Sequence, residues 1–72
     1  MSPFEQDVIL PALRNLNQRL GAINSQKLAM LIEKPERTAR HYLRRMELAG
    51  AVSRPYGVRK GWVASDLQLQ GV

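Results

Sequence analysis

The chain has 72 residues, of which 44% are hydrophobic and 24% are charged, and it contains no cysteine. This length predicts a single domain, residues 1–72, whose small core buries about 60% of the surface of the unfolded chain. The composition excludes a mainly disordered chain, and the absence of cysteine excludes disulfides and thiolate metal sites. The longest apolar run is far shorter than the roughly 20 residues of a membrane span, so we expect a cytoplasmic protein without membrane contact or secretory signal.

The positive charge is concentrated in the second half of the chain. Eleven Lys and Arg residues stand against six Asp and Glu residues, for a net charge of +5. Residues 1–33 carry three charges of each sign, whereas residues 34–72 carry eight basic and three acidic side chains. A basic surface on one side indicates a polyanionic partner, most often nucleic acid, although many small domains are basic for solubility alone.

Helix signals begin close to the N-terminus. Ser2-Pro3-Phe4-Glu5 supplies a capping hydroxyl, a proline suited to the first helical position and a carboxylate three residues after the cap. Apolar residues then recur at intervals of three and four, which predicts a first helix over about residues 3–18, ended by Gly21. Pro11 interrupts this pattern, so we expect a kink over residues 7–10 or two short helices in place of one.

A short second helix is predicted over about residues 25–33. Asn24 or Ser25 caps its start, and apolar residues follow at helical spacing. Lys34 precedes Pro35 and is therefore driven out of the helical region, so the second helix ends before it.

A third helix is predicted over about residues 36–49, with Pro35 at its start and Gly50 as a left-handed cap at its end. Its spacing gives an inward apolar face with one aromatic residue at the margin. These residues are Ala39, Leu43 and Met46, with Tyr42 at the margin.

Beyond Gly50 the pattern changes to short β-compatible runs separated by proline and glycine. They predict a small antiparallel hairpin over about residues 51–64. We expect Trp62 to close this hairpin onto the helices rather than to stack on a nucleic-acid base. The tail, residues 65–72, has no cap, and we expect it to be frayed or to pack as a short strand or helix.

One ordered set of residues sharpens this outline. The set is Leu28-Ala29, Thr38-Ala39, Leu43, Met46 and Ala49-Gly50-Ala51-Val52. With that spacing, the chain resembles the winged helix-turn-helix family of bacterial and phage DNA-binding domains over roughly residues 5–64. The resemblance implies an α+β, mostly α fold, with a three-helix core followed by a two-stranded wing. The chain departs from the family at Pro11 and at the turn Glu33-Lys34-Pro35, where the family more often has a glycine and then a Ser or Thr cap.

The resemblance implies that the third helix lies in the major groove of double-stranded DNA. Its outward residues are then Glu36, Arg37, Arg40, His41 and Arg44. The guanidinium of arginine can donate two hydrogen bonds to guanine O6 and N7, so Arg37, Arg40 and Arg44 are the expected base or phosphate contacts. The alternative is a solvated basic face without a partner.

The other polar residues of this helix have two interpretations each. Glu36 either accepts from cytosine N4 or, as we favour, complements the positive helix N-terminus. His41 is expected to contact DNA or solvent rather than a metal, because no second histidine or acidic ligand cluster accompanies it. Thr38 bonds a phosphate or its own helix backbone, and Tyr42 bonds a phosphate or packs partly in the core.

Basic residues outside the third helix complete the expected interface. In the resembling family the wing tip lies along the DNA backbone or enters the minor groove, a task for which Arg59 and Lys60 are suited. Arg54 is expected to take a neighbouring phosphate, and a solubilising role is the alternative for this loop. Gln26 and Lys27, in the first turn of the second helix, are placed for phosphate contacts.

We therefore expect a non-enzymatic, small transcriptional regulator that binds double-stranded DNA without a cofactor. The carboxylates are scattered, and the chain has no phosphate loop or catalytic triad. A different hypothesis is an adaptor for protein–protein interaction, motivated by the apolar residues Val58 and Leu67-Gln68-Leu69. Others are a role in replication, transposition or packaging of a phage or plasmid, or RNA binding through the same face. A protein partner or a homodimer stays open.

Overall fold

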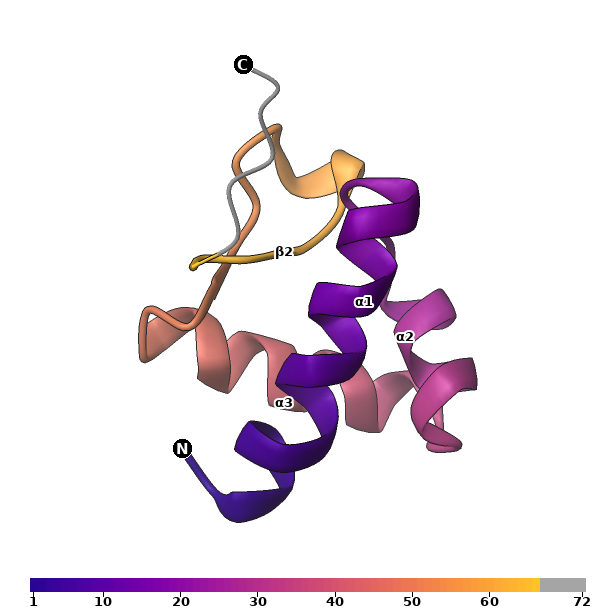
Figure 1. Ribbon diagram of the computed structural model, residues 1–72, viewed down its shortest axis with the longest axis vertical. Coiled ribbons are helices and arrows are strands. Elements are labelled where there is room, and N and C mark those ends of the chain that lie inside the picture. Colours follow the sequence, from indigo (N-terminus) through magenta and orange to yellow (C-terminus); the bar gives the residue numbers. More distant parts are fainter. Residues whose placement is uncertain (67–72) are drawn as a thin grey trace.

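The structure, a computed structural model, describes residues 1–66 and confirms the predicted fold class (Figure 1). Three helices are followed by a two-stranded antiparallel hairpin, which is the layout of a winged helix. The helices are α1 (Leu10–Leu20), α2 (Ser25–Ile32) and α3 (Glu36–Leu48). The hairpin pairs β1 (Val52–Ser53) with β2 (Val63–Ala64), and a 3₁₀ turn (Val58–Lys60) lies between them.

The first helical region begins with a reciprocal cap and carries its irregularity near Pro11. Ser2 Oγ accepts from Glu5 N at 3.2 Å, and Ser2 N donates to Glu5 Oε1 at 2.8 Å. A π-helical segment, Glu5–Ile9, then leads directly into α1, and Leu10 N donates to Glu5 O, five residues back. Of the two expectations, a kink over residues 7–10 or two short helices, the second is therefore wrong, since the helical region continues without a break to Leu20. The wider π turn accommodates a proline that has no N–H to donate, so the helical region stays continuous.

The turn between α2 and α3 is closed without glycine. Glu33 takes the left-handed conformation, with φ of 60°. Lys34 N donates to Ala29 O at 3.1 Å and Glu33 N donates to Met30 O at 3.4 Å, so the last carbonyls of α2 find partners. A side chain in this conformation costs about 1 kcal/mol relative to glycine. Glu33 thus takes the part that glycine more often has in the resembling family, at a cost in backbone strain.

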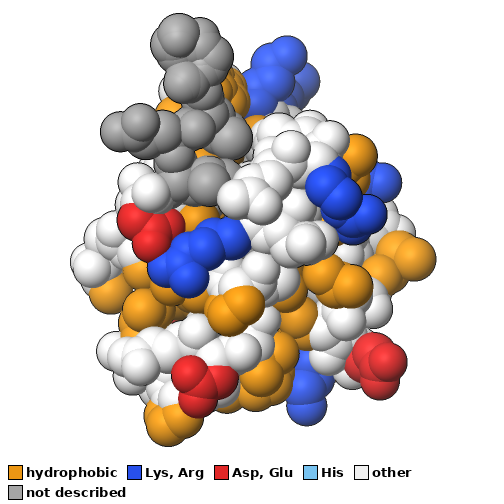
Figure 2. Space-filling model, viewed as in Figure 1, with side chains coloured by type: hydrophobic (Ala, Val, Ile, Leu, Met, Phe, Trp, Pro, Cys, Tyr) orange, Lys and Arg blue, Asp and Glu red, His pale blue; other side chains and the backbone are white. Residues whose placement is uncertain are grey.

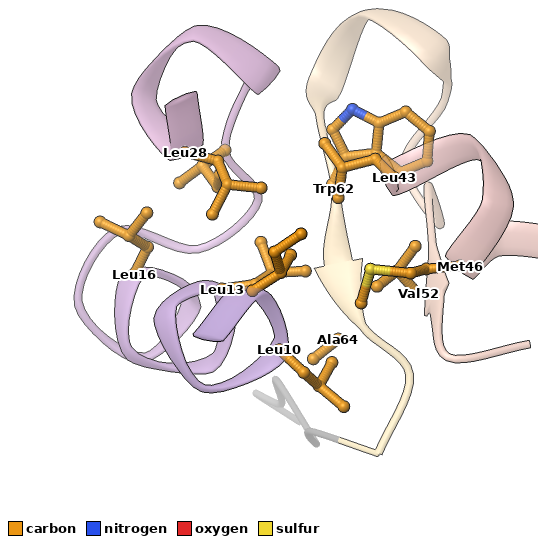
Figure 3. Packing of buried hydrophobic residues seen from close by; sticks show 11 residues of the cluster. Leu10, Leu13, Leu16, Leu28, Leu43, Met46, Val52, Trp62 and Ala64 are labelled. Carbon is orange, nitrogen blue, oxygen red and sulfur yellow. The ribbon is translucent and has the colours of Figure 1, made fainter. Parts of the chain in front are cut away.

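The core is built from one side of each helix together with the hairpin. Leu13 of α1 lies at its centre, with Leu28 of α2 on one side and Met46 of α3 on the other (Figure 3). Val52 of β1 lies beside Met46, and Trp62 packs against the same cluster with 5% of its surface exposed. The tryptophan therefore closes the hairpin onto the helices, as predicted.

Besides its apolar packing, the hairpin is hydrogen-bonded to the helices through one buried side chain, Asn17 of α1. Its Nδ2 donates to Gly21 O at 2.8 Å and to Trp62 O at 3.0 Å, and its Oδ1 accepts from Ala64 N at 2.8 Å. Ile23 and Trp62 form an antiparallel bridge beside it, with N–O distances of 2.7 and 3.2 Å. The end of α1 and the segment before α2 therefore set the position of the hairpin relative to α3.

Candidate nucleic-acid interface

One side of α3 presents a stripe of basic side chains to the exterior. Ala39, Leu43 and Met46 are buried against the core. The helical period of 3.6 residues therefore turns the opposite side outward. A surface hollow of about 250 Å³ on that side is lined by Arg37, Arg40, His41 and Arg44.

The face that carries α1 differs from this stripe. Figure 2 shows that face, in front of α3, and its Lys and Arg side chains are separated from one another by apolar and uncharged groups. Three arginines of α3, Arg37, Arg40 and Arg44, by contrast line one hollow. A cluster of positive charge raises the local potential far more than the same charges scattered over a surface.

A second hollow, of about 300 Å³, lies where α3, the start of α2 and the hairpin meet. It is lined by Asn24, Ser25, Glu36, Arg40, Arg44, Arg54, Val58, Arg59, Gly61 and Trp62. Arg40 and Arg44 line both hollows, so the two belong to one surface. We call it the α3–wing surface, defined by Arg37, Arg40, His41, Arg44, Arg54 and Arg59.

A carboxylate lies inside this basic surface. Glu36 Oε2 accepts from Arg40 Nη2 at 2.6 Å and from Ser25 Oγ at 3.1 Å. Arg40 and Glu36 are both about half exposed, whereas Ser25 is buried. Glu36 thus links the first residue of α2 to the outward face of α3, in addition to its place in the first turn of α3.

The Arg54 side chain is held between Glu47 of α3 and the ring of Trp62. Its Nε and Nη2 donate to the two carboxylate oxygens of Glu47 at 3.2 and 3.0 Å, and its guanidinium lies 4.3 Å from the centre of the Trp62 ring. Only 24% of the Arg54 side chain is exposed. A phosphate contact by Arg54, as expected from the sequence, would have to use the N–H donors that the pair with Glu47 leaves free.

Five basic side chains of the expected interface have no hydrogen bond or ion pair with any residue of the part of the chain that the structure describes. They are Lys27, Arg37, Arg44, Arg59 and Lys60. An unpaired guanidinium keeps five N–H donors for an external acceptor. The exposed side chain of His41 also lines the α3 hollow, and its ring centre lies 6.1 Å from that of Tyr42.

The hairpin residues just after the wing tip pack closely against the segment that precedes α2. Arg59 and Lys60 lie in the exposed 3₁₀ turn, which is followed by Gly61 with φ of 105°. A Cβ atom on Gly61 would clash with the backbone carbonyl of Ile23. The hairpin therefore approaches the segment before α2 this closely because residue 61 is glycine.

The remaining predicted residues lie away from the two hollows. Gln26 and Lys27 are exposed in the first turn of α2, and Lys27 N donates to Asn24 Oδ1 at 2.8 Å, which identifies Asn24 as the cap. The Lys27 side chain lines a third, largely apolar hollow between α1 and α2. Thr38 is half-buried and lines neither basic hollow. These three residues therefore line neither of the two basic hollows.

Sequence reasoning missed two residues that contact the predicted site: Ser25, which bonds Glu36, and Glu47, which pairs with Arg54. The pairing of Glu36 with Arg40 had a signal, because residues four apart on a helix are neighbours. The Ser25–Glu36 and Glu47–Arg54 contacts each join two different elements of the fold, and no rule of residue spacing predicts such contacts.

Within residues 1–66, no helix is long and apolar enough to cross a bilayer, and no group of His, Asp and Glu side chains is arranged to hold a metal ion. Comparisons with protein-family models, with curated proteins and with solved structures each find no match to this chain. Its function is therefore inferred from the side chains of the α3–wing surface.

Proposed function

We propose that this chain is a winged helix-turn-helix domain that binds double-stranded DNA and acts as a small transcriptional regulator. The observation that carries this proposal is the stripe of Arg37, Arg40 and Arg44 on the exposed side of α3. Two of these three guanidinium groups have no partner within residues 1–66. Unpaired, clustered arginines on one face of a helix suit the acceptor-rich edges and phosphates of a DNA groove.

The dimensions of α3 favour the major groove. Its 13 residues form a regular α-helix, which with side chains is about 10–12 Å across. The major groove of B-DNA is about 12 Å wide and admits such a helix. The wing tip, with Arg59 and Lys60, would then lie over the flanking backbone or minor groove. Because Asn17 and the Ile23–Trp62 bridge hold the hairpin on the helices, both parts are presented together, and little ordering is required on binding.

Titration of a fluorescent mixed-sequence duplex with the protein, at about 50 and 200 mM salt, tests the proposal. We expect a steep loss of affinity at the higher salt, since bound arginine and lysine displace counterions from phosphates. Absence of binding at the lower salt would refute DNA binding by this chain.

Substitutions locate the interface. Arg44→Ala should weaken binding to all duplexes and reduce the salt slope by about one, and Lys60→Ala should do the same from the wing. The matched control is Arg19→Ala, which removes the same charge from an exposed position of α1 that lines neither basic hollow. If Arg19→Ala weakened binding as much as Arg44→Ala, the attraction would be to net charge rather than to the α3–wing surface.

A protein-interaction adaptor is the second candidate, and one observation favours it. The hollow between α1 and α2 is lined by Leu16, Leu20, Met30 and Leu31 with Lys27, and Met30 is 74% exposed. Val58, which suggested this function from the sequence, is 72% exposed, and Leu67-Gln68-Leu69 lies outside the described residues. Met30→Gln, which changes no charge, should leave DNA affinity intact and abolish binding of a protein partner if this face is the functional one.

The same basic surface would also serve replication, transposition or packaging of phage or plasmid DNA. RNA is distinguishable, because the major groove of an A-form duplex is too deep and narrow for a helix. Competition of the bound DNA duplex with double-stranded RNA of the same sequence should therefore displace little DNA. Equal competition would favour RNA binding.

A further inference from the structure

We infer that Glu36 determines sequence specificity in the α3–wing surface, by holding Arg40 in position to read a base edge and by repelling phosphates from it. This inference rests on the proposed DNA binding. It assigns to Glu36 an action through Arg40, which makes it a positioning residue.

The carboxylate of Glu36 is fixed by a group that belongs to another helix. Ser25 is 7% exposed, and its hydroxyl donates to Glu36 Oε2 at 3.1 Å. A carboxylate that only complemented the dipole of α3 would need no partner on α2. The contact with Ser25 therefore sets the direction in which Glu36 meets the side chain of Arg40.

Arg40 keeps its reading edge free while it is held. One N–H of Nη2 donates to Glu36 Oε2 at 2.6 Å. A guanidinium has five N–H donors, so the second N–H of Nη2 and those of Nη1 still form a fork. Such a fork matches the O6 and N7 acceptors of guanine. Holding the side chain before binding also lowers the rotamer entropy lost when the contact forms.

The negative charge of Glu36 also disfavours a phosphate as the ligand of Arg40. A phosphate oxygen that approached Arg40 would meet the carboxylate within the same pair, whereas the neutral edge of guanine would not suffer this repulsion. Arg37 and Arg44 have no such neighbour within residues 1–66, so they remain open to phosphates. Discrimination between partners commonly depends on a repulsive element of this kind.

The experiment compares three variants with the wild-type protein. A preferred duplex is first selected from a random-sequence library with the wild type, and Kd is then measured for it and for a scrambled duplex in one buffer. Glu36→Ala removes the carboxylate, and Ser25→Ala removes its anchor at unchanged charge. Glu33→Gln is the matched control, because it removes one exposed negative charge close to the start of α3 from a side chain that bonds neither Ser25 nor Arg40.

The expected result separates charge from positioning. Glu36→Ala and Glu33→Gln should both tighten binding to the scrambled duplex by roughly two- to threefold, through loss of repulsion. The Kd for the scrambled duplex divided by the Kd for the preferred duplex should fall by about tenfold in Glu36→Ala, since one bidentate base contact carries discrimination of that order. The same ratio should stay unchanged in Glu33→Gln. Ser25→Ala should lower the ratio in the same direction with no change for the scrambled duplex.

Two further results would strengthen the assignment. Arg40→Ala should lose preference at the same base pair as Glu36→Ala, and the double variant should discriminate no worse than either single one. An unchanged ratio in Glu36→Ala and Ser25→Ala would overturn the inference, as would a wild type that binds DNA but selects no sequence. A wild type without salt-dependent DNA binding would overturn the proposed function as well, so the two failures are distinguishable.

Discussion

Polar side chains of the stripe on α3 are open to solvent, whereas those of the junction, where Asn17 bonds Gly21, Trp62 and Ala64, are satisfied within the chain. At the junction, Asn17 is 2% exposed, and its side chain makes three hydrogen bonds to the backbone. On the stripe, Arg37 and Arg44 are exposed and have no partner within residues 1–66. Polar groups satisfied inside the chain stabilise the fold, whereas those left open are available to a ligand. The comparison separates residues that should affect stability from those that should affect binding.

The largest effect is expected at the junction. Asn17→Ala leaves the carbonyl of Gly21 and the N–H of Ala64 without this partner and removes one of the two hydrogen bonds that Trp62 O accepts, at a cost of about 2–4 kcal/mol. For a domain of this size, the melting temperature should fall by at least about 10 °C. Asn15→Ala, at an exposed position of the same helix, is the control and should leave it unchanged. Equal melting of Asn17→Ala and the wild type would break the comparison.

A smaller effect, of the opposite sign, is expected at the turn before α3. Glu33→Gly relieves the left-handed backbone and should stabilise the fold by about 0.5–1 kcal/mol, after the added chain entropy of glycine is offset. Glu33→Gln removes the same charge and keeps a side chain at that φ, so it should not raise the melting temperature. A lower melting temperature for Glu33→Gly would show that the Glu33 side chain stabilises the turn in another way.

The smallest effect is expected on the outer side of the junction, where Arg14 of α1 pairs with Asp66 just after β2. Hydrogen bonds from the Arg14 guanidinium hold the pKa of the Asp66 carboxyl below its usual range. Because the folded pKa is lowered, the pair stabilises the protein above the ordinary aspartate pKa of about 3.9, and this is lost as the pH falls through the folded value.

Both partners of that pair are substantially exposed, so its contribution should stay below about 0.5 kcal/mol. The measurement is the difference in melting temperature between the wild type and Asp66→Asn, followed from pH 7 into the acid range. The difference should be small at neutral pH and disappear in acid. A difference that grew in acid would contradict this assignment of sign.

Much of the fold was predictable because its element boundaries carry local signals. The cap formed by Ser2 and Glu5, the break before Pro35 and the left-handed Gly50 all act within a few residues of their own position. The role of Asn17 was not predictable, because its partners lie 45 and 47 residues away for Trp62 and Ala64.

The candidate site divides in the same way. The spacing of Arg37, Arg40 and Arg44 follows from the helical period, so the stripe could be foreseen. The bond from Ser25 to Glu36 depends on the angle between two helices, and the pairing of Arg54 with Glu47 depends on the path of the hairpin. A sequence pattern specifies neither the angle between these helices nor the path of the hairpin. The i,i+4 spacing indicates the pairing of Glu36 with Arg40, but neither its anchor on α2 nor the pairing of Arg54 could be foreseen before the structure.

The long span between Asn17 and its partners also bears on the order of folding. Contacts between α2 and α3 close short loops, whereas the bonds from Asn17 to Trp62 and Ala64 join segments separated by 45 and 47 residues. Closing a long loop costs more chain entropy, so we expect the hairpin to dock after the helices have paired. A newly made chain would then carry its basic helix before its wing, and the complete surface would arise in the last step of maturation.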